Sequence, residues 1–283
     1  MQQASGFINL NKPSGISSAA AVGKIKRLTG IPCGHMGTLD PMASGVLPVA
    51  VGNSSRLFNY LLNKEKIYRA VFRFGVETDT LDALGSVLRE GEKVPEQREI
   101  NDKIRFFVGE IEQFPPAYSA KNVNGVRAYQ LARQGKPVVL QAKKVLVQSI
   151  ALTRKVSQDS YEFLITCGGG TYIRSLCRDI AKACRTVATM TSLVREKSGI
   201  FTLETACTAE QLTPENWQEF LIAPDKVFDF PALDFDDEQA RKLRNGLGVE
   251  YSRDGEYKLY LDDEFYGIAC AEGGILRAKV KLV

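Results

Sequence analysis

Residues 34–45 read Gly-His-Met-Gly-Thr-Leu-Asp-Pro-Met-Ala-Ser-Gly, which places the carboxylate of Asp40 and the chain's single histidine, His35, in one glycine-rich segment. Helical periodicity precedes this segment, and the apolar residues 46–51 that follow it predict a strand. We therefore expect residues 31–45 to form a loop between a helix and a strand. Such loops are common positions for catalytic side chains.

Three other interpretations of this segment can be considered, and two of them remain open from spacing alone. A phosphate-binding P-loop requires a Gly-Lys-Ser/Thr ending that opens a helix, whereas Gly45 opens a strand, so we set that interpretation aside. Asp40 precedes a proline, and Asp-Pro is a common turn initiator. His35 could equally be a loop histidine with an ordinary hydrogen bond. The whole string, rather than either residue, favours catalysis.

Length and composition predict a soluble globular protein of two domains. The chain has 283 residues, of which 44% are hydrophobic and 25% charged. The N-terminus lacks the basic and apolar regions of a signal peptide and no run is long enough to span a membrane, so we expect a cytoplasmic protein with no membrane partner. The six cysteines form no Cys-x-x-Cys pair and there is one histidine, which predicts reduced thiols and neither a metal nor another cofactor.

Positive charge is concentrated in one part of the chain. Residues 113–158 contain eight basic side chains and no acidic one, which leaves 29 basic and 33 acidic residues elsewhere. Such a segment on a mildly acidic body is typical of a protein that binds a polyanion, because phosphate contacts release counterions. The alternative is a solvated basic face that binds nothing.

Apolar periodicity and turn residues predict the other elements. Residues 113–136 contain two prolines and several Asn and Gly residues, and they read as an excursion from a sheet with one short helix near 127–133. Beyond residue 208, an acidic stretch leads to short alternating runs that predict a small β-rich domain. The remaining predictions are strands at 6–10, 67–74, 144–152 and 161–167, and helices at 17–30, after Ser55, at 96–107 and from Gly170 to about Cys184.

Several motifs together resemble one known family. The string around Asp40 fits the signature G-H-x-G-T-L-D-P-x-A-S-G-x-L of the TruB-type tRNA pseudouridine-55 synthases at every fixed position. The resemblance extends over about residues 6–205, with one departure at residues 52–56, where the family usually has Ala-Thr before the basic residue. Further matching motifs are Lys12 to Ser18, Lys66 to Tyr68, Thr78 to Gly85, Pro115 to Lys121 and Gly168 to Leu176.

The resemblance implies an α+β fold and three catalytic residues. We expect a catalytic domain at residues 1–230, built on a mixed, mostly antiparallel sheet with flanking helices, and a small PUA-like domain at 235–283. Asp40 is implied to be the nucleophile, Arg174 its ion-pair partner, and Tyr68 a residue that stacks on the target base. Elementary chemistry agrees, since a carboxylate can attack without a metal, and an adjacent guanidinium stabilises its charge and fixes its orientation. Taken alone, Arg174 would more often bind phosphate and Tyr68 would more often be core.

The resemblance also implies a set of RNA-binding positions. His35 is expected to occupy the space that a flipped base leaves, and Leu193 to line the pocket, although an ordinary core leucine is the simpler interpretation. The basic segment at 113–136 is expected to be the thumb that holds the T-arm of tRNA. The other expected RNA-binding or orienting residues are Lys12, Arg56, Asp82, Lys121, Arg127, Arg133 and Lys136.

The implied function is isomerisation of the T-loop uridine of tRNA, at position 55, to pseudouridine by a monomer. One alternative is a tRNA-binding or tRNA-folding protein with incidental catalysis or none. Another is a synthase that depends on a guide RNA, which the thumb argues against, because guide-dependent relatives lack it.

Overall fold

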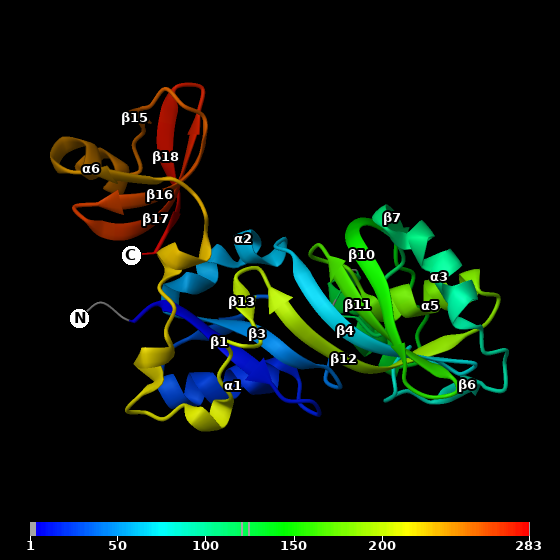
Figure 1. The fold of residues 1–283 in the computed structure, drawn as a ribbon. Coiled ribbons are helices and arrows are strands. Elements are labelled where there is room, and N and C mark those ends of the chain that lie inside the picture. Colours follow the sequence, from blue (N-terminus) through cyan, green and yellow to red (C-terminus); the bar gives the residue numbers. More distant parts are fainter. Residues whose placement is uncertain (1–3, 120, 124, 283) are drawn as a thin grey trace.

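A nine-stranded, mostly antiparallel sheet forms the body of the molecule (Figure 1). The structure, a computed structural model, describes residues 4–119, 121–123 and 125–282. Only the contact between β3 and β12 within this sheet is parallel. Strand β2 (Cys33–His35) adds to β3, and β13 (Phe201–Thr202) adds to β12. The order of the other strands is β1 (Gly6–Lys12), β3 (Ser44–Val51), β12 (Ala188–Ser198), β4 (Lys66–Phe74), β11 (Ser160–Cys167), β10 (Lys143–Lys155) and β7 (Gly109–Gln113).

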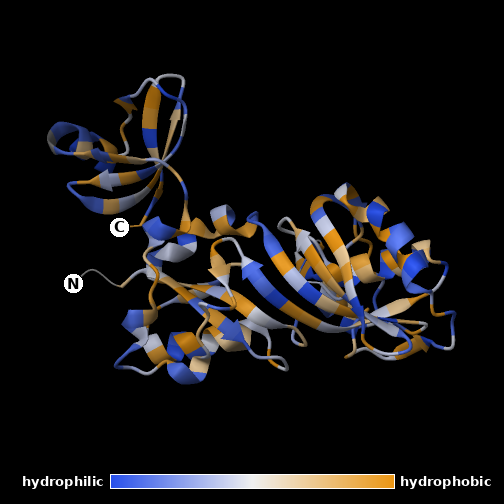
Figure 2. Cartoon of the chain, in the orientation of Figure 1, coloured by the Kyte–Doolittle hydropathy of each residue, from blue (hydrophilic) through white to orange (hydrophobic). Residues whose placement is uncertain are grey.

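The central strand β4 carries the alternation that the sequence predicts. Tyr68, Ala70, Phe72 and Phe74 are buried, and the residues between them are more exposed. Figure 2 shows this alternation of hydrophobic and hydrophilic residues along the central strands. The buried side chains join one large apolar cluster with α3 (Gln97–Ile104) and α5 (Ile173–Ala183), so these helices cover one face of the sheet.

Helix α1 (Ser18–Thr29) begins and ends where the sequence predicts. The side chain of Ser17 accepts a hydrogen bond from the backbone nitrogen of Ala20, which satisfies one of the free N–H groups of the first turn. Gly30 adopts a left-handed conformation with φ 68°, which favours glycine, and its N–H bonds the carbonyl of Lys26. The chain is thereby turned directly into the segment that contains Asp40.

That segment is not wholly a loop, which corrects the sequence prediction. Residues 33–35 form β2 and pair with residues 49–51 of β3, so His35 lies opposite Val49 on a strand. Alternating apolar residues are absent from a strand of three residues, so the periodicity that reveals longer strands could not show it. The consequence is that the turn around Asp40 spans only residues 36–43, between two paired strands.

The predicted excursion at residues 113–136 contains the short helix that was expected, α4 (Ala128–Arg133). It also contains a small hairpin that the sequence did not predict, β8 (Asn122–Val123) with β9 (Val126–Arg127). The segment leaves the sheet at the end of β7 and returns at the start of β10. The other short elements of the body are η1 (Gly52–Leu57), α2 (Phe58–Leu62), β5 (Glu77–Thr78), β6 (Val87–Arg89), η2 (Arg105–Phe107), η3 (Ala209–Gln211), η4 (Trp217–Phe220) and η5 (Pro224–Val227).

A separate five-stranded sheet follows residue 231 and has an apolar cluster of its own (Figure 1). A further apolar cluster joins it to the body, because Ile268 and Leu282 pack in one group with Phe7 and Met36. The strand order is β14 (Ala232–Phe235), β16 (Gly255–Leu261), β17 (Glu264–Glu272), β18 (Ile275–Lys281) and β15 (Val249–Glu250), and α6 (Asp237–Arg244) packs against β15 and β18.

Candidate active site

Asp40 and Arg174 form a two-pronged ion pair. The Nε of Arg174 lies 2.8 Å from Oδ2 of Asp40, and its Nη2 lies 2.8 Å from Oδ1. The Arg174 side chain is 5% exposed and the Asp40 side chain 27%. Parallel hydrogen bonds of this kind fix the plane of a carboxylate as well as its position. Asp40 is therefore held in one orientation with an edge open to solvent.

Arg174 also joins three segments that are distant in sequence. Its Nη1 donates to the carbonyl of Thr80 at 2.9 Å, and its Nη2 donates to the carbonyl of Tyr118, at the root of the thumb, at 3.1 Å. Asp82, which is buried, has its Oδ2 3.5 Å from Nη1. The structure thus places Asp82 beside the ion pair, which agrees with an orienting role.

Lys12 lies under the Asp40 turn and is fully buried. Its ammonium donates to the carbonyls of Pro13 and Ile16, each at 2.8 Å, and lies 3.4 Å from the carbonyl of Pro41. Burial lowers the pKa of Lys12 to about 8, while the charge of Asp40 opposes that shift. Of the two roles expected for Lys12, this geometry supports orientation of the turn and not contact with RNA.

Tyr68 and Leu193 lie on the adjacent strands β4 and β12 and belong to the large apolar cluster. Tyr68 is 7% exposed and Leu193 is 5% exposed. Burial raises the pKa of the Tyr68 phenol above its ordinary value, and the Arg195 guanidinium opposes that shift as a cation and hydrogen-bond donor. The negative charge of Asp40 also raises the pKa of this phenol, so Tyr68 lies within electrostatic range of the Asp40 carboxylate.

His35 is the last residue of β2 and has one ring nitrogen without a hydrogen-bond partner among the described residues. That nitrogen, Nδ1, is buried. Burial lowers the pKa of His35, and the nearby cation of Arg195 lowers it further. The neutral form of the imidazole is therefore favoured, and no described residue satisfies its buried Nδ1.

The other predicted RNA-binding residues lie on η1 and in the thumb. Arg56 donates from Nη1 to the carbonyl of Lys281 at 2.6 Å, at the contact between the body and the C-terminal sheet. In the thumb, Arg127 and Lys136 are exposed, and the guanidinium of Arg133 lies 5.6 Å from the centre of the Tyr129 ring. Burial and then the neighbouring Lys143 lower the pKa of Lys121 to about 8.

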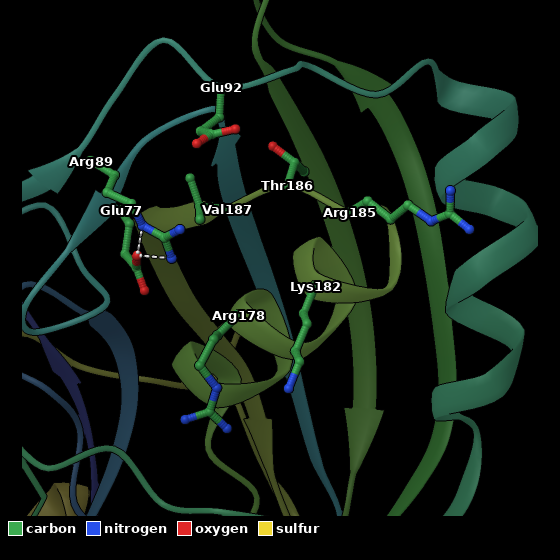
Figure 3. A pocket seen from close by; sticks show the side chains of 9 residues that line it. Glu77, Arg89, Glu92, Arg178, Lys182, Arg185, Thr186 and Val187 are labelled. Atoms are coloured by element: carbon green, nitrogen blue, oxygen red, sulfur yellow. Dashed lines mark hydrogen bonds and ion pairs between the residues drawn. The ribbon is translucent and has the colours of Figure 1, made fainter.

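A cavity of about 460 Å³ lies between the β5–β6 hairpin and the C-terminal half of α5 (Figure 3). It is lined by both signs of charge, and Arg89 forms an ion pair with Glu77 at 2.6 Å. In Figure 3, Arg178 and Lys182 project in the same direction from α5. None of the residues that line this cavity belongs to the ion pair or to the Asp40 turn.

Two further buried basic residues, Arg195 and Lys66, were not predicted as part of the site. Arg195 is 1% exposed and donates a hydrogen bond of 3.1 Å to the carbonyl of Gly37, in the Asp40 turn. Lys66 is 4% exposed and donates to the carbonyls of Leu62 and Lys64. The signals in the sequence were that Lys66 opens the matching motif Lys66 to Tyr68 and that Arg195 lies two residues after Leu193.

Within the described ranges, no group of three or more His, Cys, Asp or Glu side chains is arranged to hold a metal ion. The six cysteines are free thiols. No helix in the described part of the chain is both long and apolar enough to cross a bilayer.

Comparison with known proteins agrees with the motifs. The model of the TruB family of pseudouridylate synthases, N-terminal domain, matches residues 26–173, which is more than half of the chain. The chain is also 41% identical over 271 residues to tRNA pseudouridine synthase B of Clostridium perfringens, covering 93% of this chain and 92% of that protein.

The chain belongs to the TruB family of pseudouridylate synthases.

Other relatives extend the same result. The chain is 36% identical over 282 residues to tRNA pseudouridine synthase B of Caldanaerobacter subterraneus, covering 97% of this chain and 98% of that protein. The homologous protein of Zymomonas mobilis is 39% identical over 252 residues, covering 85% of this chain and 83% of its own length. The TruB family relationship therefore includes the C-terminal sheet as well as the body.

Solved structures share the fold at low sequence identity. A chain in the crystal structure of a Cbf5-Nop10-Gar1 complex superposes with a TM-score of 0.74 at 23% identity, covering 98% of this chain and 85% of that chain. A chain of an H/ACA RNP bound to a substrate RNA containing 2′-deoxyuridine gives 0.73 at 22% identity, covering 98% and 85%. The predicted α+β fold of the TruB family member, with a mostly antiparallel sheet and a small C-terminal β-rich part, is confirmed.

Proposed function

We propose that this TruB family protein isomerises the T-loop uridine of tRNA, at position 55, to pseudouridine. The observation that carries the proposal is the ion pair between Asp40 and Arg174. Asp40 lies in a turn, and its side chain is partly open to solvent. The relatives that the chain matches over most of its length are tRNA pseudouridine synthases. We propose that the protein is an isomerase acting on tRNA.

The chemistry assigns a role to each residue around the ion pair. Asp40 acts as the nucleophile: one carboxylate oxygen bonds to the substrate as the bond between C1′ of the ribose and N1 of uracil breaks, and that oxygen leaves again when the new bond to C5 forms. The freed ring turns, a bond forms between C1′ and C5, and the C5 proton then passes by way of the Tyr68 hydroxyl to solvent while N1 takes up a proton. No atoms are gained or lost overall, so the reaction can proceed with protein side chains alone.

The target base must leave its stack before Asp40 can reach it. We assign to Tyr68 the face on which the flipped uracil stacks, with Leu193 as a neighbouring apolar wall. His35 is assigned to the stack that the base has left, and burial favours the neutral form of its imidazole by lowering its pKa. Tyr68 and Leu193 are buried on adjacent strands, and His35 is half-buried directly before the Asp40 turn.

The thumb and the C-terminal sheet are proposed to hold the remainder of the tRNA. Lys121, Arg127, Arg133 and Lys136 contact the T-arm, and the small PUA-like sheet contacts another part of the same RNA. We propose a catalytic domain at residues 1–230 and an RNA-binding domain at 235–283, which act as a monomer without a guide RNA.

The proposed function is tested by incubating the purified protein with an unmodified tRNA transcript and mapping pseudouridine. Conversion at position 55 alone, without added RNA or cofactor, is the expected result. A transcript with cytidine at that position is the matched control and should remain unmodified. Tight binding with no pseudouridine would favour a tRNA-folding protein, and conversion only after addition of a guide RNA would favour a guide-dependent enzyme.

We expect Tyr68→Phe to keep tRNA affinity and to lower the single-turnover rate. The ring still stacks on the base, but the hydroxyl can no longer take part in proton transfer, a contribution of about 10²–10⁴-fold in other enzymes. Single-turnover rates at saturating tRNA measure this effect. Equal rates for wild type and variant would restrict Tyr68 to stacking.

We expect the thumb cations to add affinity without adding sequence specificity, because phosphate contacts carry no base information. A triple alanine variant at Lys121, Arg127 and Arg133 should flatten the plot of log affinity against log salt by about two units. The titration should be carried out at pH 7, because Lys121 has a pKa of about 8 and is positively charged below it.

The matched control for this titration is a triple alanine variant of Arg98, Lys103 and Arg105, on and directly after α3. Its salt slope should equal that of wild type. An unchanged slope in the thumb variant, together with a collapsed single-turnover rate at saturating tRNA, would show that the thumb shapes the active site instead of binding the RNA backbone.

A further inference from the structure

Among the described residues, Arg195 is the largest whose side chain is fully buried. Its guanidinium donates to three backbone carbonyls: to Val46 at 2.6 Å, to Gly37 at 3.1 Å and to Thr38 at 3.4 Å. Burial of a cation is unfavourable unless its donors are satisfied. A planar fork of donors is suited to several carbonyls that converge on one plane.

These carbonyls lie on both sides of Asp40. Gly37 and Thr38 precede it in the turn, and Val46 follows the turn on β3. One rigid side chain therefore ties the beginning of the turn to the strand after its end. From the other side, the Ser18 hydroxyl donates to the carbonyl of Leu39 at 2.9 Å, so the turn is held between two sets of bonds.

The backbone of Arg195 is held as closely as its side chain. It pairs with Gly45 of β3 on one side and with Tyr68 of β4 on the other. Gly45 has φ 101°, and a Cβ at this position would collide with the carbonyl oxygen of Arg195. Arg195 thus contacts the strand that leaves the Asp40 turn and the strand that carries Tyr68.

We propose that Arg195 is a positioning residue that sets the Asp40 turn against Tyr68 for the isomerisation. This inference rests on the proposed function, because it assigns Arg195 to the same reaction. Arg195 does not contact the substrate, and its effect passes through the carbonyls of Gly37, Thr38 and Val46. A misplacement of about 1 Å at a reacting group can lower a rate by about 10²-fold, so the loss of these bonds should affect rate more than binding.

The test compares Arg195→Met and Arg195→Lys with wild type in single-turnover assays at saturating tRNA. Methionine fills a similar apolar volume but leaves three carbonyls without a donor, and we expect a rate loss of about 10²-fold. Lysine keeps the positive charge and can donate to only some of the three carbonyls. It should therefore be faster than the methionine variant and slower than wild type. The dissociation constant for tRNA should stay within about twofold, because the phosphate-binding thumb is unchanged.

The control is Arg73→Met, on the same strand as Tyr68. Arg73 pairs with Asp159 at 2.8 Å and its side chain is 50% exposed. Its loss should leave the single-turnover rate unchanged. If Arg195→Met fails to fold by circular dichroism, Arg195→Lys carries the comparison by itself.

A double-mutant cycle between Arg195→Lys and Tyr68→Phe separates positioning from general destabilisation. Contacting residues that act together have non-additive effects, so the double variant should be faster than the product of the single effects predicts. Additive effects, or a folded Arg195→Lys variant as fast as wild type, would overturn the inference. Inactive wild-type protein would instead refute the proposed function, so the two failures are distinguishable.

Discussion

Asp40→Asn should abolish pseudouridine formation while leaving tRNA binding nearly intact. Asparagine has the same shape as aspartate, so the turn and the neighbouring Lys12 keep their positions, but an amide cannot act as the nucleophile. Loss of a nucleophile typically lowers kcat by about 10⁴-fold or more. Single-turnover conversion of a tRNA transcript, followed for hours, measures the remaining rate.

Affinity must be measured beside that rate, because the same result could arise from lost binding. The dissociation constant of Asp40→Asn for tRNA should lie within a few fold of wild type. Asp79→Asn is the matched control, since Asp79 lies outside the Asp40 turn and accepts a hydrogen bond from Tyr118 at 3.3 Å. Turnover of Asp40→Asn within tenfold of wild type would exclude Asp40 as the nucleophile.

Arg174→Met should lower both the rate and the stability of the fold. The substitution leaves the carboxylates of Asp40 and Asp82 without their shared cation, and it removes donors from the carbonyls of Thr80 and Tyr118. Breaking a buried ion pair by removing one partner lowers the free energy of unfolding by about 3–5 kcal/mol. Urea unfolding measures this change, and single-turnover assays measure the rate.

Arg174→Lys is the informative companion, because lysine restores the charge without the two-pronged geometry. It should recover most of the stability and little of the rate. If Arg174→Lys were as fast as wild type, charge alone would suffice and the orientation of Asp40 would not depend on the fork.

The sequence predicted those features that depend on local pattern. The cap of α1 at Ser17, its end at Gly30 and the alternation of β4 follow from side-chain chemistry and periodicity. The contact between Asp40 and Arg174 joins residues 134 positions apart, and no spacing rule predicts such a contact. It was expected only through the resemblance to a family.

The role of Arg195 was missed for a physical reason. In a regular strand, residues alternate between faces, and an arginine is expected on the solvated one. The register of β12 against β4 shifts between Met190 and Ser192 and again between Arg195 and Lys197. Each irregularity changes which side chains face inward, and no residue type in the strand announces it.

Lys12 shows a second limit of sequence reasoning. A basic residue in an RNA-binding family suggests phosphate contact, but this ammonium is satisfied by backbone carbonyls beneath the Asp40 turn. Residue type gives the charge, whereas only the fold decides whether that charge meets solvent or the interior of the protein.

The apolar cluster that joins the C-terminal sheet to the body has a mechanical consequence. Phe7 and Met36 belong to the body, Ile268 and Leu282 belong to the C-terminal sheet, and rotation of one part against the other would expose all four to water. Asn53 reinforces this contact with a hydrogen bond of 2.8 Å to the carbonyl of Leu282. These contacts hold the body and the C-terminal sheet in one fixed arrangement. A partner that contacts both parts must therefore adapt its own shape to that arrangement.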